Sequence, residues 1–307
     1  MNDKVPAPAR SKGTGRQAAR AGAPRTASGA TTSAFDAISA NGSRQRHGWL
    51  RGIGRWFSFT GQRRNDTRFT VFPRPVVMAE LLALFASIIV FLVLFVDPIV
   101  LERMRQNGFS GSAFFEMITR LGEAAWILYP TGLVLVGATL FTANRFRGKR
   151  RFMWHRLVLN AYFLFTAVAF SGLLANLLKN LIGRARPEFT ELGHVWQSMP
   201  FGHTYQFAAF PSGHSTTAGA AAIALALLFP RARIFMVLAG IWIAISRPAL
   251  GVHFPSDMVA GFTFGAAFSW FYARAFARKR LLFNFMPGGG LKLRGAPGFT
   301  RFWSSKG

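Results

Sequence analysis

The stretch LVLNAYFLFTAVAFSGLLANLL, residues 157–178, contains no charged residue and ends directly before Lys179. A transmembrane helix needs about 20 predominantly apolar residues to cross ~30 Å of hydrocarbon, so this stretch predicts a membrane span. Further apolar stretches flank it at 76–98, 123–143, 214–229, 232–246 and 257–274. The sequence therefore predicts an all-α, polytopic bundle of six transmembrane helices.

The composition also favours a membrane protein and removes several chemistries. Of the 307 residues, 51% are hydrophobic and 16% are charged, whereas an ordinary soluble domain has roughly 25% charged residues. The chain contains no cysteine. This absence excludes disulfides, thiolate zinc sites and cysteine nucleophiles.

Basic residues indicate how the bundle is oriented. The chain has 37 Lys and Arg against 11 Asp and Glu, a net charge of +26. Such an excess can serve nucleic acids, anionic lipids or the cytoplasmic loops of a membrane protein. Basic clusters occupy the N-terminal segment, 144–156, 230–233 and 278–280. With six spans these clusters all fall on one side, so the positive-inside rule places both termini in the cytoplasm. We therefore expect a lipid bilayer, and no nucleic acid, as the partner.

Three regions are expected along the chain. Residues 1–70, rich in Ala, Gly, Ser, Thr and Arg, predict a disordered basic cytoplasmic tail. Residues 71–280 form the predicted six-span domain, and residues 281–307 a basic cytoplasmic C-terminal tail. No apolar stretch of secretory-signal type precedes Val76, so the first span is expected to be retained. The short Pro-Arg-Ala-Arg turn at 230–233 predicts that the fourth and fifth spans form a helical hairpin.

The expected outer segments are 99–122, which includes an amphipathic surface helix, 179–213 and 247–256. They carry cations where helices leave the bilayer: Lys179, Arg184, Arg186 and Arg247. Ionisable side chains at such positions are costly unless they are paired. An anionic ligand is one candidate partner, and interfacial snorkelling is the alternative for each cation taken alone.

Two helix starts lie in the same outer segments. In Phe210-Pro211-Ser212-Gly213-His214-Ser215, the free N–H groups of a helix start suit phosphate oxygens, and His214 can donate a proton. In the second, His253 lies four residues before Asp257, whose carboxylate can orient the imidazole. Each feature alone also fits an ordinary capped helix.

Together these segments resemble the three-part signature of the type 2 phosphatidic acid phosphatase superfamily. The matching residues are Lys179, six residues, Arg186-Pro187; then Pro211-Ser212-Gly213-His214; then Ser246-Arg247, five residues, His253, three residues, Asp257. The resemblance covers about residues 76–277. It implies an active site at the non-cytoplasmic helix ends of a bacterial inner-membrane protein, facing the periplasm.

The resemblance also implies a role for each residue. His253 is the nucleophile that forms a phosphohistidine, Asp257 orients it, and His214 is the general acid and base. The phosphate-binding residues are Lys179, Arg186, Ser212, Gly213 and Arg247. Arg184 is outside the signature and is expected to contact the lipid head group. No metal or other cofactor is implied, and Asp257 is the sole acid after Glu191.

The expected activity is hydrolysis of a lipid phosphate: a lipid A phosphate, phosphatidylglycerol phosphate, undecaprenyl diphosphate or phosphatidate. A lipid phosphotransferase with the same phosphohistidine is a close alternative. A non-catalytic anion transporter or lipid-binding protein explains the spans but not the spacing of the histidines. The outer loop 188–210, with His194, His203, Trp196 and Tyr205, is a candidate lid, although histidines in surface loops are common.

Overall fold

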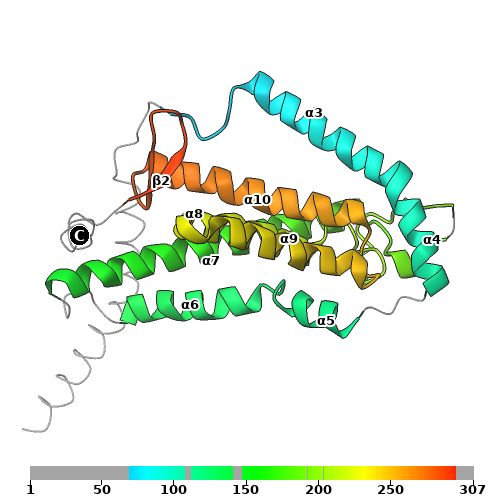
Figure 1. Cartoon of the computed structure of the whole chain (residues 1–307), viewed down its shortest axis with the longest axis horizontal. Helices are drawn as coiled ribbons and strands as arrows, with labels where there is room; N and C mark the ends of the chain where they lie inside the picture. Colours follow the sequence, from blue (N-terminus) through cyan, green and yellow to red (C-terminus); the bar gives the residue numbers. More distant parts are fainter. Residues whose placement is uncertain (1–68, 108–111, 141–146, 192, 203, 295–307) are drawn as a thin grey trace, which may run out of the picture. The chain divides into compact units, whose positions relative to one another are not determined.

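A computed structural model of the chain describes residues 69–107, 112–140, 147–191, 193–202 and 204–294 (Figure 1). The fold within these residues is built from helices, with one short hairpin at the end. The helices are α3 Pro75–Phe91, η1 Leu92–Val96, α4 Asp97–Asn107, α5 Ala113–Arg120, α6 Ala125–Leu140, α7 Gly148–Ile182, η3 Pro187–Phe189, α8 Gly213–Leu228, η4 Pro230–Ala232, α9 Arg233–Ala249 and α10 Pro255–Arg278. The strands are β1 Phe283–Phe285 and β2 Leu291–Leu293.

Helices occupy all six positions that the sequence predicts. Within the described residues, four are long and apolar enough to cross a membrane: Pro75–Gln106, Ala113–Leu140, Gly148–Ile182 and Pro230–Ala249. The predicted hairpin at 230–233 is present, since α8 ends at Leu228 and α9 begins at Arg233. The first outer segment also contains a helix, α5, which lies within the candidate span Ala113–Leu140 and not on the surface alone.

The remaining two helices, α8 and α10, are not among these four candidate spans. Both lie inside the bundle. α8 has 16 residues, ten of which are buried, and most of these are Ala, Ser, Thr or Gly. α10 has 24 residues and buries nine. A helix that packs against protein on most sides needs less apolar surface than one that faces lipid.

Glycines bring α8 and α10 into backbone contact. A Cβ added to Gly265 of α10 would lie 2.1 Å from the carbonyl oxygen of Thr216, and one on Gly261 would lie 2.4 Å from that of Ser212. From α8, a Cβ on Gly219 would lie 2.1 Å from the carbonyl oxygen of Phe262. Small residues at this spacing let membrane helices approach closely. We call this contact the glycine seam.

The first predicted span is exposed and contains a π-helical turn. None of the 17 residues of α3 is buried, and Figure 1 shows α3 apart from the helices that surround α8. The turn η1 ends at Val96, and the amide of the next residue, Asp97, donates to the carbonyl oxygen of Leu92, five residues earlier. Such turns change the direction of the side chains that follow and are frequent at functional sites.

Residues 281–294, at the start of the expected C-terminal tail, contain a short hairpin. β1 and β2 pair in antiparallel orientation, with Phe283 opposite Leu293. Phe283 is fully buried, and its ring lies 5.1 Å from that of Phe163. The glycine turn between two apolar segments, FNFMPGGGLKL at 283–293, is the hairpin signal. The expected tails at 1–68 and 295–307 lie outside the described residues.

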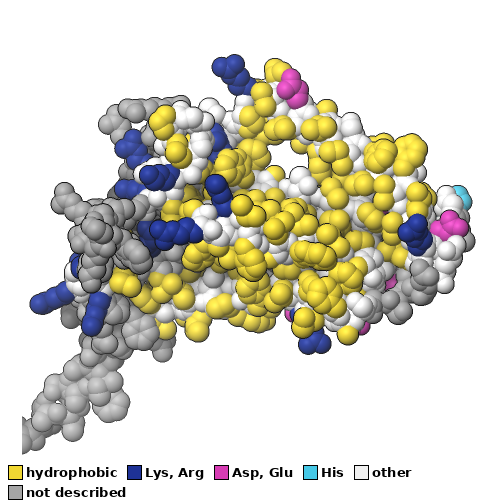
Figure 2. Space-filling view, in the orientation of Figure 1, with side chains coloured by type: hydrophobic (Ala, Val, Ile, Leu, Met, Phe, Trp, Pro, Cys, Tyr) yellow, Lys and Arg dark blue, Asp and Glu magenta, His cyan; other side chains and the backbone are white. Residues whose placement is uncertain are grey.

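The surface in Figure 2 is largely apolar along the helices, with Lys and Arg concentrated near one end. Large apolar side chains that are exposed in the described residues include Leu133, Leu173, Ile234 and Phe235. Exposed apolar area of this extent on several helices is typical of contact with lipid.

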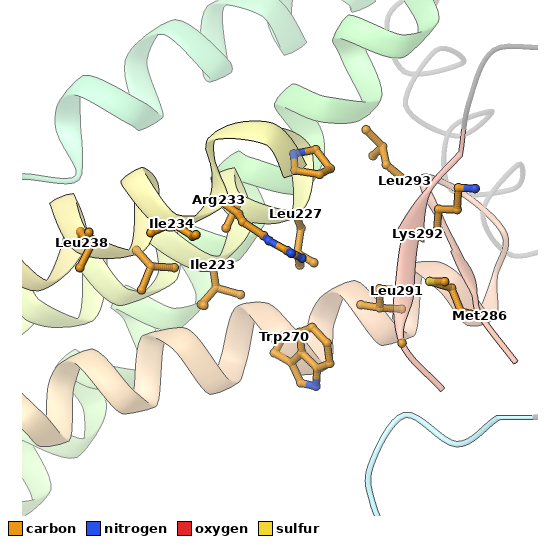
Figure 3. A pocket seen from close by; sticks show the side chains of 14 residues that line it. Ile223, Leu227, Arg233, Ile234, Leu238, Trp270, Met286, Leu291, Lys292 and Leu293 are labelled. Atoms are coloured by element: carbon orange, nitrogen blue, oxygen red, sulfur yellow. The ribbon is translucent and has the colours of Figure 1, made fainter. Parts of the chain in front are cut away.

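An apolar pocket of about 790 Å³ lies beside the C-terminal ends of α8 and α10 (Figure 3). Its lining includes Ile223, Leu227, Trp270 and Leu291, with Lys292 among the polar members. The residues of the predicted signature occupy the opposite ends of these helices, so this pocket is separate from the site described next.

Candidate active site

The first part of the site follows the end of α7. Gly183 caps this helix in the left-handed conformation, with φ of 59°, and a Cβ there would lie 2.0 Å from the carbonyl oxygen of Met199. The chain then runs extended, because the amides of Ala185 and Arg186 donate to the carbonyl oxygens of Gln197 and Gln206. These bonds fix the backbone that carries the predicted arginines.

Arg186 is held from the outer loop. Its Nε donates to the carbonyl oxygen of Tyr205 at 3.0 Å, and the Tyr205 ring lies 3.8 Å from the guanidinium carbon. Nη1 donates to the carbonyl oxygen of Val252, just before His253, at 3.3 Å. Burial lowers the pKa of Arg186 from its ordinary value. This side chain therefore joins the loop to the segment that carries the proposed nucleophile.

The second part is the start of α8. Ser212 is the N-cap, and its side-chain oxygen accepts from the amide of Ser215 at 3.5 Å. The Ser212 amide donates to the main-chain oxygen of Asp257 at 3.1 Å, which ties this start to that of α10. A Cβ added to Gly213 would lie 3.7 Å from Nζ of Lys179, so the ammonium group lies over the first turn of α8.

The third part is the imidazole of His253 with its carboxylate. Nδ1 of His253 lies 3.5 Å from Oδ2 of Asp257, and the amide of Phe254 donates to the same oxygen at 2.9 Å. Contacts of this kind are often long without substrate and shorten during reaction. Burial lowers the pKa of His253 to about 3, against the opposing effect of Asp257. The imidazole is therefore neutral at neutral pH, and Nε2 is the nitrogen that does not face the carboxylate.

The structure brings the three parts to one place. Both His214 and His253 interact electrostatically with Arg186 and Arg247, and Lys179 interacts with the same two arginines. Nη1 of Arg247 donates to Oγ1 of Thr119 on α5 at 2.8 Å, while its Nε is buried without a partner. Cations gathered this closely around two imidazoles form a site suited to an anion.

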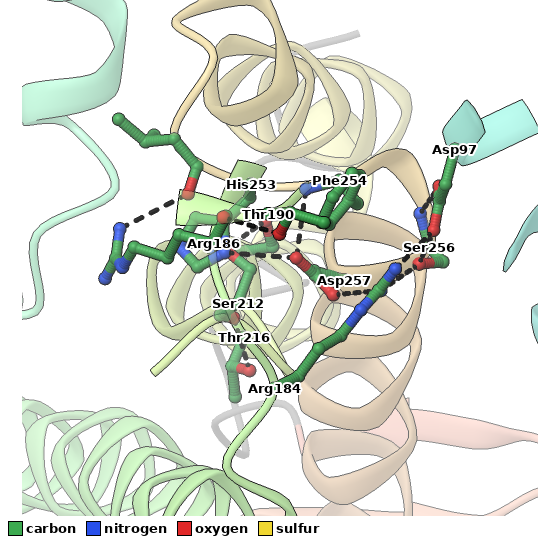
Figure 4. A network of polar contacts seen from close by, with 12 residues as sticks. Asp97, Arg184, Arg186, Thr190, Ser212, Thr216, His253, Phe254, Ser256 and Asp257 are labelled. Carbon is green, nitrogen blue, oxygen red and sulfur yellow. Dashed lines mark hydrogen bonds and ion pairs between the residues drawn. The ribbon is translucent and has the colours of Figure 1, made fainter. Parts of the chain in front are cut away.

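Arg184 differs from the head-group contact that the sequence predicts. Its side chain is fully buried and forms ion pairs with Asp257, at 2.6 Å, and with Asp97, at 2.9 Å (Figure 4). The rings of Trp196 and Phe254 lie over its guanidinium at 4.7 and 4.3 Å. A side chain enclosed in this way has no surface to offer a lipid head group.

Asp97 is the residue that sequence reasoning missed. The signal was available, since a carboxylate at the end of an apolar stretch is expensive and usually functional. The outer loop contributes Trp196 and Tyr205, which cover the two arginines, whereas His194 is exposed and His203 lies outside the described residues. Among the described residues, no group of three or more His, Asp or Glu could hold a metal ion.

Comparison with known proteins identifies the class. Residues 160–281 match the family model described as the PAP2 superfamily, and the chain belongs to this superfamily. This match includes all three parts of the site. Together with the relatives described next, it makes the chain a multi-pass membrane lipid phosphatase, and the non-catalytic alternative is set aside.

The similar proteins are bacterial phosphatases. A lipid A 1-phosphatase of Rhizobium johnstonii is 43% identical over 179 residues, which is 57% of this chain and 71% of that protein. The lipid A 1-phosphatase of Rhizobium etli is 42% identical and is covered to 75%. Phosphatidylglycerophosphatase B of Bacillus subtilis is 30% identical over 48% of this chain and 66% of that protein.

One solved structure is also similar. It is the crystal structure of a transmembrane PAP2 type phosphatidylglycerolphosphate phosphatase from Bacillus subtilis, with 20% sequence identity and a TM-score of 0.36. The alignment covers 74% of this chain and 94% of that chain.

Proposed function

We propose that this protein removes the 1-phosphate of lipid A, or of a closely related bacterial envelope lipid, by way of a phosphohistidine. The observation that carries the chemistry is the set of contacts that join the three parts. Nη1 of Arg186 donates to the carbonyl oxygen of Val252, beside His253, and the Ser212 amide at the start of α8 donates to the main-chain oxygen of Asp257. The identity of 42–43% with two lipid A 1-phosphatases supports the choice of substrate.

In the first step, Nε2 of His253 attacks phosphorus and a P–N bond forms while the P–O bond to the lipid breaks. The departing lipid oxygen takes a proton from His214. Asp257 stabilises the positive charge that develops on the attacking imidazole. Charge on the equatorial oxygens is met by Lys179, Arg186 and Arg247, with the Ser212 hydroxyl and the Gly213 amide as further donors.

In the second step, His214 takes a proton from water, and the resulting oxygen attacks phosphorus. The P–N bond breaks, and inorganic phosphate and neutral His253 are released. An alcohol that replaced water in this step would give phosphoryl transfer to a second lipid. This is the alternative reaction of the same intermediate, and it is distinguished by whether phosphate is released.

The test is a panel of four lipid phosphates. Detergent-purified protein is assayed for phosphate release from lipid A 1-phosphate, phosphatidylglycerol phosphate, undecaprenyl diphosphate and phosphatidate. We expect the highest kcat/KM with lipid A 1-phosphate, unchanged activity in excess EDTA, and inhibition by vanadate. Strict dependence on added Mg²⁺ would contradict the proposed reaction, and preference for another lipid would contradict the proposed substrate alone.

We also propose six spans with the site on the periplasmic face. The chain has no cysteine, so single cysteines report on sidedness without background. His194→Cys, in the exposed outer loop, should react with an impermeant thiol reagent in spheroplasts, and Arg150→Cys, exposed at the start of α7, should react only after lysis. The reverse pattern would place the site in the cytoplasm.

A further inference from the structure

We propose that Asp97 and Arg184 are positioning residues for the phosphatase reaction, acting on His253 through Asp257. This inference rests on the proposed function, in which His253 is the nucleophile. Asp97 belongs to the first helical region, Arg184 follows α7, and Asp257 lies in the first turn of α10. The network therefore joins three parts of the chain to the nucleophile (Figure 4).

Hydrogen bonds connect Asp97, Ser256, Arg184 and Asp257, and the last link, from Asp257 to His253, is a contact of 3.5 Å. Nη1 of Arg184 donates to Oδ1 of Asp257 and to Oγ of Ser256, each at 2.6 Å, and Nη2 donates to Oδ2 of Asp97 at 2.9 Å. Ser256 in turn donates its hydroxyl to Oδ2 of Asp97 at 2.5 Å and its amide to Oδ1 at 3.1 Å. The same guanidinium thus binds both carboxylates, and Ser256 in addition holds the carboxylate of Asp97.

Because the charged groups of this network are buried, the loss of any one of them affects the others. The side chains of Asp97, Arg184 and Asp257 are all 0% exposed. Two carboxylates share a single guanidinium, so loss of Arg184 would leave both buried without a cation. Loss of the Asp97 charge instead leaves the pair of Arg184 and Asp257 balanced. Removing one partner of a buried pair is costly because the remaining charge is uncompensated, and this cost is smallest at Asp97.

The guanidinium has little freedom to move. Trp196 and Phe254 lie over it, and Nη2 also donates to the carbonyl oxygen of Val195 at 2.9 Å. The carboxylate of Asp97 provides the other acceptor for Nη2. Without this carboxylate, Nη2 keeps only the bond to Val195, and the Ser256 hydroxyl loses its acceptor. The guanidinium is then held less firmly against Asp257.

Displacement of Asp257 passes directly to the nucleophile. Oδ1 is bound by Arg184, whereas Oδ2 faces Nδ1 of His253 at 3.5 Å and accepts from the Phe254 amide. A rotation of the carboxylate therefore changes the orientation of the imidazole. Misplacement of a reacting group by about 1 Å can reduce the rate by ~10²-fold.

The test compares Asp97→Asn and Arg184→Lys with the unaltered protein. For each we expect kcat to fall by about 10- to 100-fold with KM changed little, as for outer partners of other catalytic groups. The Ki for vanadate should rise by a similar factor, because vanadate bonds to the imidazole nitrogen only when that nitrogen is aligned. Ki does not depend on how much of the protein folds, so a raised Ki distinguishes positioning from simple loss of folded enzyme.

A matched control is available on the same helix. Glu102 of α4 is exposed and accepts a hydrogen bond from Gln106, so Glu102→Gln makes the same charge change away from the network. It should leave kcat and Ki unaltered. His253→Ala is measured beside the other variants to test the nucleophile itself.

The outcomes are distinct. An inactive His253→Ala, together with unchanged kcat per folded enzyme and unchanged Ki in Asp97→Asn and Arg184→Lys, would overturn the positioning role alone. Full activity of His253→Ala would overturn the proposed function instead. A rise in KM with unaltered kcat and vanadate affinity would show that Asp97 and Arg184 serve substrate binding, contrary to the proposal.

Discussion

His253→Ala should abolish turnover, with activity falling to the background of the assay. In the proposed mechanism the substitution removes the nitrogen that forms the P–N bond, and the surrounding cations supply no nucleophile in its place. The His253 side chain is almost completely buried and neutral at neutral pH, since burial lowers its pKa to about 3. The measurement is steady-state phosphate release together with trapping of an acid-labile phosphoenzyme, which should be lost as well.

The control for this variant is His194→Ala, which removes an exposed imidazole from the outer loop. It should retain the activity of the unaltered protein. A phosphoenzyme that persists in His253→Ala would move the nucleophile to another residue. Complete loss of activity in His194→Ala would show that the outer loop does more than cover the arginines.

His214→Ala should reduce kcat by about 10²- to 10⁴-fold on a lipid substrate, the usual contribution of a general acid. His214 lies in the first turn of α8, within the field of Arg247, Lys179 and Arg186. In the proposed mechanism it protonates the departing lipid oxygen and later activates water. Both steps of the lipid reaction are therefore slowed.

A substrate with a better leaving group separates these two steps. p-Nitrophenyl phosphate needs little protonation to depart, so His214→Ala should still form the phosphohistidine and release one equivalent of nitrophenol in a burst. The second step remains slow, and the phosphoenzyme should accumulate. Equal losses on both substrates without a burst would contradict the assignment of His214 as the general acid.

The helical elements could be predicted because their signals are local. Each apolar stretch, the Pro-Arg-Ala-Arg turn at 230–233 and the two helix starts are readable within about 20 residues of sequence. The three parts of the site were equally readable, since each is contained in one short segment. The number of fully apolar spans was harder to predict, because α8 and α10 pack against other helices and need less apolar surface.

Long-range contacts could not be predicted in the same way. Asp97 and Arg184 are 87 positions apart, and their pairing depends on how the π-helical turn η1 directs the first carboxylate of α4. Arg184 is one of several cations after α7, and sequence alone does not show which of them faces protein and which faces substrate. The C-terminal hairpin gives a local signal, a glycine turn between apolar segments, that the excess of basic residues obscured.

The glycine seam limits where the specificity of this enzyme can change. Along the glycine seam the backbones of α8 and α10 are in direct contact, so no side chain can be made smaller or larger there to widen the site for a different lipid. The spacing between His214, the proposed general acid at the start of α8, and His253, the proposed nucleophile just before α10, is consequently fixed by the contact between these two helices. Substitutions intended to accept other phosphorylated lipids should therefore be made in the outer loop over residues 188–210 and not in these helices.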